Sequence, residues 1–263
     1  MQLQAQVRAE PANARLRVFL FQLLAVLGQW GRALNQLQVA GELDAGSLAM
    51  VNTYREALRC EVLRAEVFAG ARSPLIFGDP QQWLALLLEA LRLTAQGRHS
   101  ESQALRAEAF ALAPTTGGSV DGAPCAWLAD ADARLGPVLE AIVNGRYYWI
   151  PLQRVRQIRV EAPVDLRDLV WAPAHLAWAN GGDAVALIPT RYPGSESSED
   201  PQLRMARKTD WIAQPAELYL GLGQRMLASD TGEYPLLEIR QVTLATDQSP
   251  DTPAAPWVSP EQP

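Results

Sequence analysis

The distribution of proline divides this 263-residue chain into two parts that must fold differently. Only three of the 19 prolines precede residue 114, whereas the others lie from Pro114 onward. Proline disrupts helix interiors but is tolerated in turns and at strand edges, so only the first part is suited to long helices. We therefore predict an α+β chain with an α-helical domain over residues 1–114. A β-rich domain over residues 115–245 and a disordered, proline-rich tail over residues 246–263 are expected to follow.

Apolar residues in the first part recur with the three- and four-residue spacing of a buried helix face. One helix is expected to start near Asp79, which can cap it, with Pro80 at the first position and Gln82 closing a capping box. The complete pattern predicts helices over Leu16–Leu27, Ala33–Ala40, Val51–Ala65, Asp79–Leu91 and Glu101–Ala113.

The helical part also contains an internal repeat. The motif Gly28-x4-Ala33-x6-Ala40 matches Gly97-x4-Ser102-x6-Ala109, and the two glycines are 69 residues apart. This distance is close to twice the period of about 34 residues that is typical of tetratricopeptide helix hairpins. We expect about three hairpins stacked as a short solenoid, whose concave face would suit a peptide or a helix. A plain helical bundle is the alternative.

The second part shows the alternation and the turns of β-structure. Asn144-Gly145 separates two apolar runs and suits a two-residue hairpin turn, because both of its residues tolerate positive φ. In the strand that follows, Tyr147 and Trp149 share one face and Tyr148 lies on the other. We expect a small, curled antiparallel sheet or partial barrel. Its strands are predicted at Trp127–Arg134, Leu139–Val143, Arg146–Ile150, Arg154–Glu161, His175–Ala179, Ala184–Pro189 and Glu238–Leu244, with a short helix at Asp165–Leu169.

Charge and composition argue against several classes of protein. The net charge of −6 is unfavourable for binding nucleic acid, which requires a basic surface. The longest apolar stretch, Val18–Leu27, is too short to cross a membrane, and the protein is expected to be cytoplasmic. Cys60 and Cys125 are far apart and lack neighbouring metal-ligand motifs, so we expect two buried thiols and neither a metal nor another cofactor.

Two carboxylates give the chain its main candidate for catalysis. Asp130 and Asp132 would share a face of a strand and could bind a cation or act as an acid–base pair in a cleft between the domains. The simpler interpretation is a solvated strand face, or pairing with Arg134 and Arg146. We predict no enzymatic activity, and keep a hydrolase-like or metal-dependent enzyme as the alternative.

Aromatic residues are more numerous in the second part than one small sheet face requires. They include Trp127, and one face of the sheet is expected to leave aromatic surface for an interface. The loop Thr190–Glu196 would either bind an anion through Arg191 or brace a hairpin through local hydrogen bonds. The candidate partner-binding residues are Trp30, Trp83, Tyr147, Tyr148, Trp149, Arg191 and Tyr192.

Four blocks of this sequence resemble the ImpE/TagJ/SciE family of accessory proteins encoded with bacterial type VI secretion systems. The similarity runs from about Leu16 to Val242. The blocks are Asp130–Pro137, Asn144–Pro151, Asp165–Pro173 and Thr190–Glu196.

The resemblance implies a tetratricopeptide-like helical part joined to a β-rich part, and a non-enzymatic role. It implies binding to the small subunit of the contractile sheath through that subunit's N-terminal helix. It also links the protein to sheath assembly, or to disassembly by a ClpV-type unfoldase. Helix hairpins able to cradle an amphipathic helix agree with this role. A purely structural assembly subunit is a further alternative, and the sequence leaves open whether the chain forms a homodimer.

Overall fold

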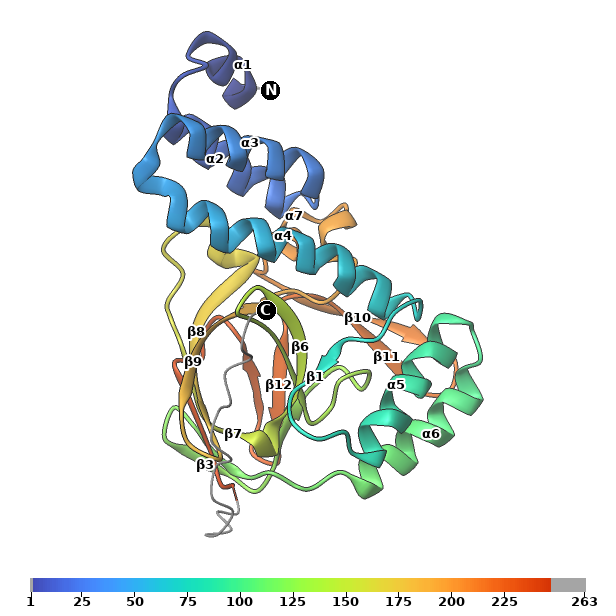
Figure 1. The fold of residues 1–263 in the computed structure, drawn as a ribbon. Helices are drawn as coiled ribbons and strands as arrows, with labels where there is room; N and C mark the ends of the chain where they lie inside the picture. Colours follow the sequence, from blue (N-terminus) through green and yellow to red (C-terminus); the bar gives the residue numbers. More distant parts are fainter. Residues whose placement is uncertain (1, 247–263) are drawn as a thin grey trace, which may run out of the picture.

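The computed structural model describes residues 2–246 and confirms the expected order, with helices first and a largely antiparallel sheet after them (Figure 1). The α-helices are α1 (Gln2–Ala9), α2 (Ala14–Val26), α3 (Trp30–Leu43), α4 (Leu48–Phe68), α5 (Gln82–Ala95), α6 (His99–Leu112) and α7 (Pro201–Arg204). The 3-10 helices are η1 (Ala45–Ser47), η2 (Leu152–Arg154), η3 (Leu166–Leu169) and η4 (Ser195–Ser197).

The internal repeat corresponds to two helix hairpins, α2–α3 and α5–α6. Gly28 follows α2 with φ +65°, and Gly97 follows α5 with φ +75°. After each glycine, the next amide donates to a carbonyl of the preceding helix, Gln29 to Leu24 and Arg98 to Leu93. The small residues of the motif, Ala33, Ala40, Ser102 and Ala109, are completely buried. The repeat is therefore a repeated turn and a repeated close contact between helices.

Two expectations for the helices are wrong. The chain after α4 does not form the second helix of a middle hairpin. It forms the two-residue strand β1 (Leu75–Ile76), which joins the sheet in parallel with β6 (Arg146–Pro151). Asp79 does not cap α5 either, because the helix starts later, with Gln81 at the N-cap position and no side-chain cap.

The strands form a nine-stranded sheet, a two-stranded ribbon and a three-stranded sheet. In the nine-stranded sheet the order is β1-β6-β5-β9-β8-β7-β14-β2-β3, and Figure 1 shows that it curls strongly. The remaining strands are β2 (Gly118–Val120), β3 (Ala123–Cys125), β4 (Leu128–Asp130), β5 (Val138–Val143), β7 (Val155–Val160), β8 (Trp171–Trp178), β9 (Asp183–Pro189), β10 (Thr209–Gln214), β11 (Leu218–Gly223), β12 (Met226–Ser229), β13 (Glu233–Pro235) and β14 (Gln241–Leu244).

Both hairpins predicted from the sequence are present. β5 and β6 pair in antiparallel fashion around Asn144 and Gly145, whose φ values are +50° and +72°. β8 pairs with β9, although β8 begins at Trp171, earlier than expected. The predicted strand over Trp127–Arg134 is only partly formed, because β4 ends at Asp130 and a turn follows.

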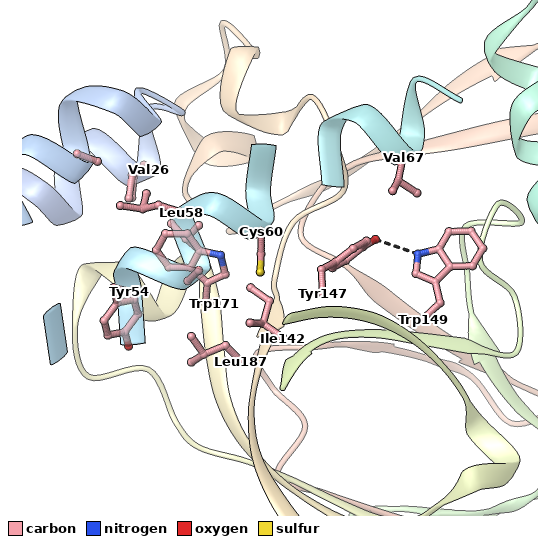
Figure 2. Packing of buried hydrophobic residues seen from close by; sticks show 14 of the residues in the cluster. Val26, Tyr54, Leu58, Cys60, Val67, Ile142, Tyr147, Trp149, Trp171 and Leu187 are labelled. Atoms are coloured by element: carbon pink, nitrogen blue, oxygen red, sulfur yellow. Dashed lines mark hydrogen bonds between the residues drawn. The ribbon is translucent and has the colours of Figure 1, made fainter. Parts of the chain in front are cut away.

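Two apolar cores lie on opposite faces of the sheet. One is enclosed by the curl and includes Ile150 and Leu176. The other lies between the sheet and the helices, where Tyr147 and Trp149 of β6 and Trp171 of β8 meet α4 (Figure 2). Tyr148 packs against the enclosed core. The three aromatics of β6 therefore divide between two faces as predicted.

The helices and strands share one of these cores. The division into two domains between residues 114 and 115 therefore stays a prediction. The predicted disordered tail lies outside the described residues from position 247 onward. Between residues 2 and 246, no helix is both long enough and apolar enough to span a membrane. Cys60 and Cys125 are buried and unbonded to each other, as expected.

Candidate functional site: an apolar groove beside α6

An apolar surface depression lies between the end of α6 and the segment around β4. It has a volume of about 480 Å³. We call it the Trp127 groove. Its lining residues are Phe110, Ala113–Thr116, Trp127–Ala131, Ala133, Gly136, Pro137 and Ala228.

In the segment Trp127–Arg134, which lines much of the groove, the charged side chains are buried and the alternate, apolar side chains face outward. Leu128, Asp130, Asp132 and Arg134 are all at least 92% buried. The alternate residues face outward: Trp127 is 39% exposed, and the three alanines at positions 129, 131 and 133 are partly exposed. A solvated surface normally shows the opposite arrangement. Exposed apolar side chains gathered in a groove indicate a surface for binding another molecule.

One wall of the groove depends on a close approach between α6 and the turn after β4. The ring of Phe110, 37% exposed, lies against Gly136. A Cβ atom at Gly136 would be 2.5 Å from the Phe110 ring, and this glycine has φ +54°. A larger residue would displace the ring and narrow the groove.

The turn that carries the alanines is fixed from inside by Asp132. Its carboxylate accepts hydrogen bonds from the Arg134 guanidinium and from the Arg134 backbone N–H, at 2.9 Å for each to Oδ1. The backbone N–H of Gly221 donates to Asp132 Oδ2 at 2.8 Å. The Arg134 guanidinium also stacks on the ring of Phe68, at the end of α4, 5.0 Å from its centroid. The floor of the groove is thereby tied to both β11 and α4.

Asp130 belongs to the same inner layer. Its Oδ1 accepts hydrogen bonds from the Tyr192 hydroxyl and the Asp132 backbone N–H, at 2.9 Å in both cases. Its Oδ2 lies 3.4 Å from Nε of Arg225, which is completely buried. Burial raises the pKa of Asp130 to about 6, although the charge of Arg225 opposes this shift. Burial likewise lowers the pKa of Arg225 to about 10.

Glu140 connects this layer to α4. Its carboxylate accepts two hydrogen bonds from Arg64, at 2.8 and 3.0 Å, and others from Arg225 and the Tyr147 hydroxyl. Trp149 donates to the Tyr147 hydroxyl at 2.9 Å, as Figure 2 shows. Glu61, also on α4, lies 3.6 Å from Arg64. The buried Arg64–Glu140 pair therefore joins the sheet to the helical part.

Most of the seven residues predicted to bind a partner are buried. Trp83, Tyr147, Trp149, Arg191 and Tyr192 are at most 4% exposed. Trp30 and Tyr148 are partly exposed, and their rings lie 6.1 Å from Trp171 and Phe77 respectively. The structure does not bring the seven together on one surface. Their role in binding stays a prediction, and the burial of these five requires any such role of theirs to be indirect.

Arg191 makes contacts that occupy its guanidinium. Nη1 donates to the carbonyl of Val26 at the end of α2 (2.8 Å) and to that of Arg204 (2.6 Å). Burial lowers the pKa of Arg191 to about 10. Ser195 Oγ, in the same loop, donates to the Tyr192 carbonyl and accepts from the Gly223 N–H. The loop therefore braces the structure, which was one of its two predicted roles.

Two predictions place Asp130 and Asp132 on an accessible strand face, either as a cation or acid–base site or as a solvated face. The structure places them differently. Neither residue is solvated, because the alternation buries this side of the segment. Asp132 pairs with Arg134 as predicted, whereas Arg146 is exposed on the β5–β6 turn. Across residues 2–246, no cluster of three or more His, Cys, Asp or Glu side chains has the arrangement of a metal site.

Sequence reasoning missed the apolar groove although its signal was present. The alternation of Trp127 and the alanines with charged residues predicts a strand whose charged side faces solvent, whereas the structure buries that side. The composition of the segment alone could not decide this, because the buried partners Arg225 and Tyr192 are more than 60 residues away in the sequence.

The chain is similar in sequence and in fold to known proteins. A family model described as "ImpE protein" matches residues 122–243. Over 240 residues the chain is 55% identical to the "Type VI secretion system accessory component TagJ" of Pseudomonas aeruginosa, covering 91% of this chain and 84% of that protein. The fold is similar to the crystal structure of protein VPA1032 from Vibrio parahaemolyticus. That match has a TM-score of 0.85 and 21% identity, and covers 94% of this chain and 92% of the other.

Proposed function

Because this chain belongs to the ImpE family of type VI secretion system accessory proteins, we propose that it is a cytoplasmic, non-enzymatic adaptor. Its partner is the small subunit of the contractile sheath, whose N-terminal helix it binds. Binding modulates sheath assembly, or sheath disassembly by a ClpV-type unfoldase. The observation that carries this proposal is the reversed burial of Trp127–Arg134, which places apolar side chains in an open groove.

The groove has the composition that an amphipathic helix requires. Alanines line the groove together with the large apolar side chains of Trp127 and Phe110, and the apolar stripe of a helix lies against them. The aromatic walls supply most of the binding free energy, as tryptophan commonly does at interfaces. The segment also lies within residues 122–243, the region that matches the family model.

A titration with a peptide of the sheath subunit's N-terminal helix tests this proposal. We expect Trp127→Ala to weaken binding at least about tenfold, because a partly exposed tryptophan that becomes buried is a typical hot spot. Ala131→Glu is expected to abolish binding, since it places a charge on the apolar floor. Fluorescence anisotropy of a labelled peptide measures both effects.

Two control variants locate the site. Tyr219→Ala removes an aromatic side chain that is 57% exposed outside the groove, and should leave the affinity unchanged. Phe19→Ala alters a second depression, between α2 and η3, where Phe19 is 50% exposed. If Phe19→Ala abolishes binding and Trp127→Ala does not, the helix docks on α2 instead. No binding by the unaltered protein at micromolar concentration would contradict the adaptor proposal itself.

A further inference from the structure

A second groove lies between α4 and the β5–β6 turn, on a surface that the Trp127 groove does not include. It has a volume of about 470 Å³. We call it the Arg146 groove. Its lining residues are Arg59, Cys60, Leu63, Arg72, Ser73, Leu75, Gly145, Arg146 and Tyr147.

Positive charge is concentrated in the Arg146 groove although the chain has a net charge of −6. The side chains of Arg59 and Arg72 are both 63% exposed. Arg59 shares Glu56 with Arg55, and Arg72 lies 3.6 Å from Glu66. Three arginines therefore line this groove, and within the described part of the chain only Arg59 and Arg72 have a carboxylate partner close by.

Arg146 is the arginine with the fewest contacts in the groove. Its side chain is exposed and makes no hydrogen bond or ion pair to any residue between positions 2 and 246. The turn presents it in a fixed place, because Arg146 pairs with Val143 as the first residue of β6. An exposed guanidinium without a partner among residues 2–246 is available to a carboxylate ligand, which it can bind through two parallel hydrogen bonds.

The groove also has an apolar component. Leu75, on β1, is 44% exposed, and Leu63 of α4 is partly buried beside it. Cys60 supplies no charge, because burial raises the pKa of its thiol to about 12. The surface therefore combines separated positive charges with two leucines, whereas the lining of the Trp127 groove is mostly apolar.

We propose that the Arg146 groove docks an acidic segment of a protein partner. Its carboxylates pair with Arg59, Arg72 and Arg146, and an apolar side chain of the segment lies on Leu63 and Leu75. A nucleic acid fits the surface less well, because the chain's overall charge repels a polyanion and the exposed floor offers leucine instead of an aromatic ring for base stacking. The proposal gives the protein a second docking surface and does not depend on helix binding at the first.

The test uses the full chain and a fluorescein-labelled peptide of Glu-Glu-Leu repeats, with Lys-Lys-Leu and Ser-Ser-Leu peptides for comparison. We expect only the acidic peptide to bind, and its affinity to fall as salt is added. Arg146→Glu and Arg72→Glu should each weaken binding at least about fivefold, because each replaces an attraction with a repulsion. Both positions are exposed, so the thermal midpoint should stay constant.

Arg159→Glu is the matched control, since it makes the same change in net charge at an exposed position on β7. It should leave the affinity unchanged, as should Trp127→Ala. Equal weakening by Arg159→Glu would show a response to net charge alone and overturn the proposal. Binding of a single-stranded oligonucleotide as tight as that of the acidic peptide, or no binding of the acidic peptide, would also overturn it.

Discussion

At the scale of single residues, the unusual feature is the set of charges buried between the sheet and α4. Glu140 has no exposed surface and is bonded by both Arg64 and Arg225, which themselves are at most 5% exposed. A buried pair is not in itself evidence of high stability, because desolvation opposes the attraction. Removing one partner is nevertheless costly, since it leaves the other charge buried without compensation.

Glu140→Gln is expected to lower the free energy of unfolding by about 3–5 kcal/mol, because two buried guanidinium groups lose their shared carboxylate. Urea denaturation followed by circular dichroism measures this effect. Glu89→Gln, which breaks the surface pair with Arg92, should leave the denaturation midpoint unchanged. Equal midpoints for Glu140→Gln and the unaltered protein would show that the buried pairs are energetically neutral.

Asp130 makes a contribution to the free energy of unfolding that depends on pH. Burial raises its pKa from 3.8 to about 6, so the folded state binds the proton more tightly than the unfolded state does. This contribution is fully present below about pH 4 and is lost as the pH rises through about 6. Asp130→Asn abolishes it.

The free energy of unfolding of the unaltered protein, minus that of Asp130→Asn, should therefore fall as the pH rises from about 4 to about 6.5. The decrease should not exceed about 3 kcal/mol, because one pKa unit corresponds to about 1.4 kcal/mol. Denaturant titrations at a series of pH values measure this difference. A difference that stays constant, or rises with pH, would contradict the proposed origin of the shift.

At the scale of secondary-structure elements, local sequence explains most of what forms. The turn at Asn144-Gly145 has positive φ at both residues, as this pair of residues favours. The first helix of each helix hairpin is followed by a glycine, and both turns have the same hydrogen-bond pattern. Strands β2, β3 and β10–β13 were not predicted, and most of them are short. Although β2–β3, β10–β11 and β12–β13 pair locally, β2 and β12 join their sheets through the distant partners β14 and β4.

Two glycine substitutions should act in opposite directions. Gly145→Ala is expected to destabilise the protein by about 1–2 kcal/mol, because alanine is strained at φ +72° and its Cβ would lie 3.1 Å from the Glu56 side chain. Gly31→Ala, in the first turn of α3, has free space around its Cβ and should stabilise by up to about 1 kcal/mol. Thermal unfolding of both variants shows whether each substitution lowers or raises the unfolding midpoint. A stabilising Gly145→Ala would show that the turn adopts another conformation in solution.

At the scale of the whole molecule, the sheet links the two parts of the chain. β1, from the helical part, pairs with β6, and the core between sheet and helices contains residues from α1 to β9. The Arg64–Glu140 pair crosses the same boundary. These contacts favour cooperative unfolding of helices and strands over independent domains.

A fragment of residues 115–246 is therefore expected not to fold alone, because it would expose Trp149 and Trp171 where α4 covers them in the intact chain. In the full chain, circular dichroism and tryptophan fluorescence should report the same urea transition. A fragment that folds with native-like stability, or two separated transitions, would support the division into domains at residue 114.

The sequence by itself determined the α+β order, both hairpins, the hairpin repeat and the family, because these depend on local spacing, turn residues and long similar blocks. It did not determine which side of Trp127–Arg134 faces solvent. The tertiary structure decided this, because Arg225, Tyr192 and Gly221 come from segments far away in the sequence and bind the carboxylates from inside. The same distance in sequence explains why the predicted aromatic binding residues are largely core. Burial results from partners that the local pattern of a strand does not reveal.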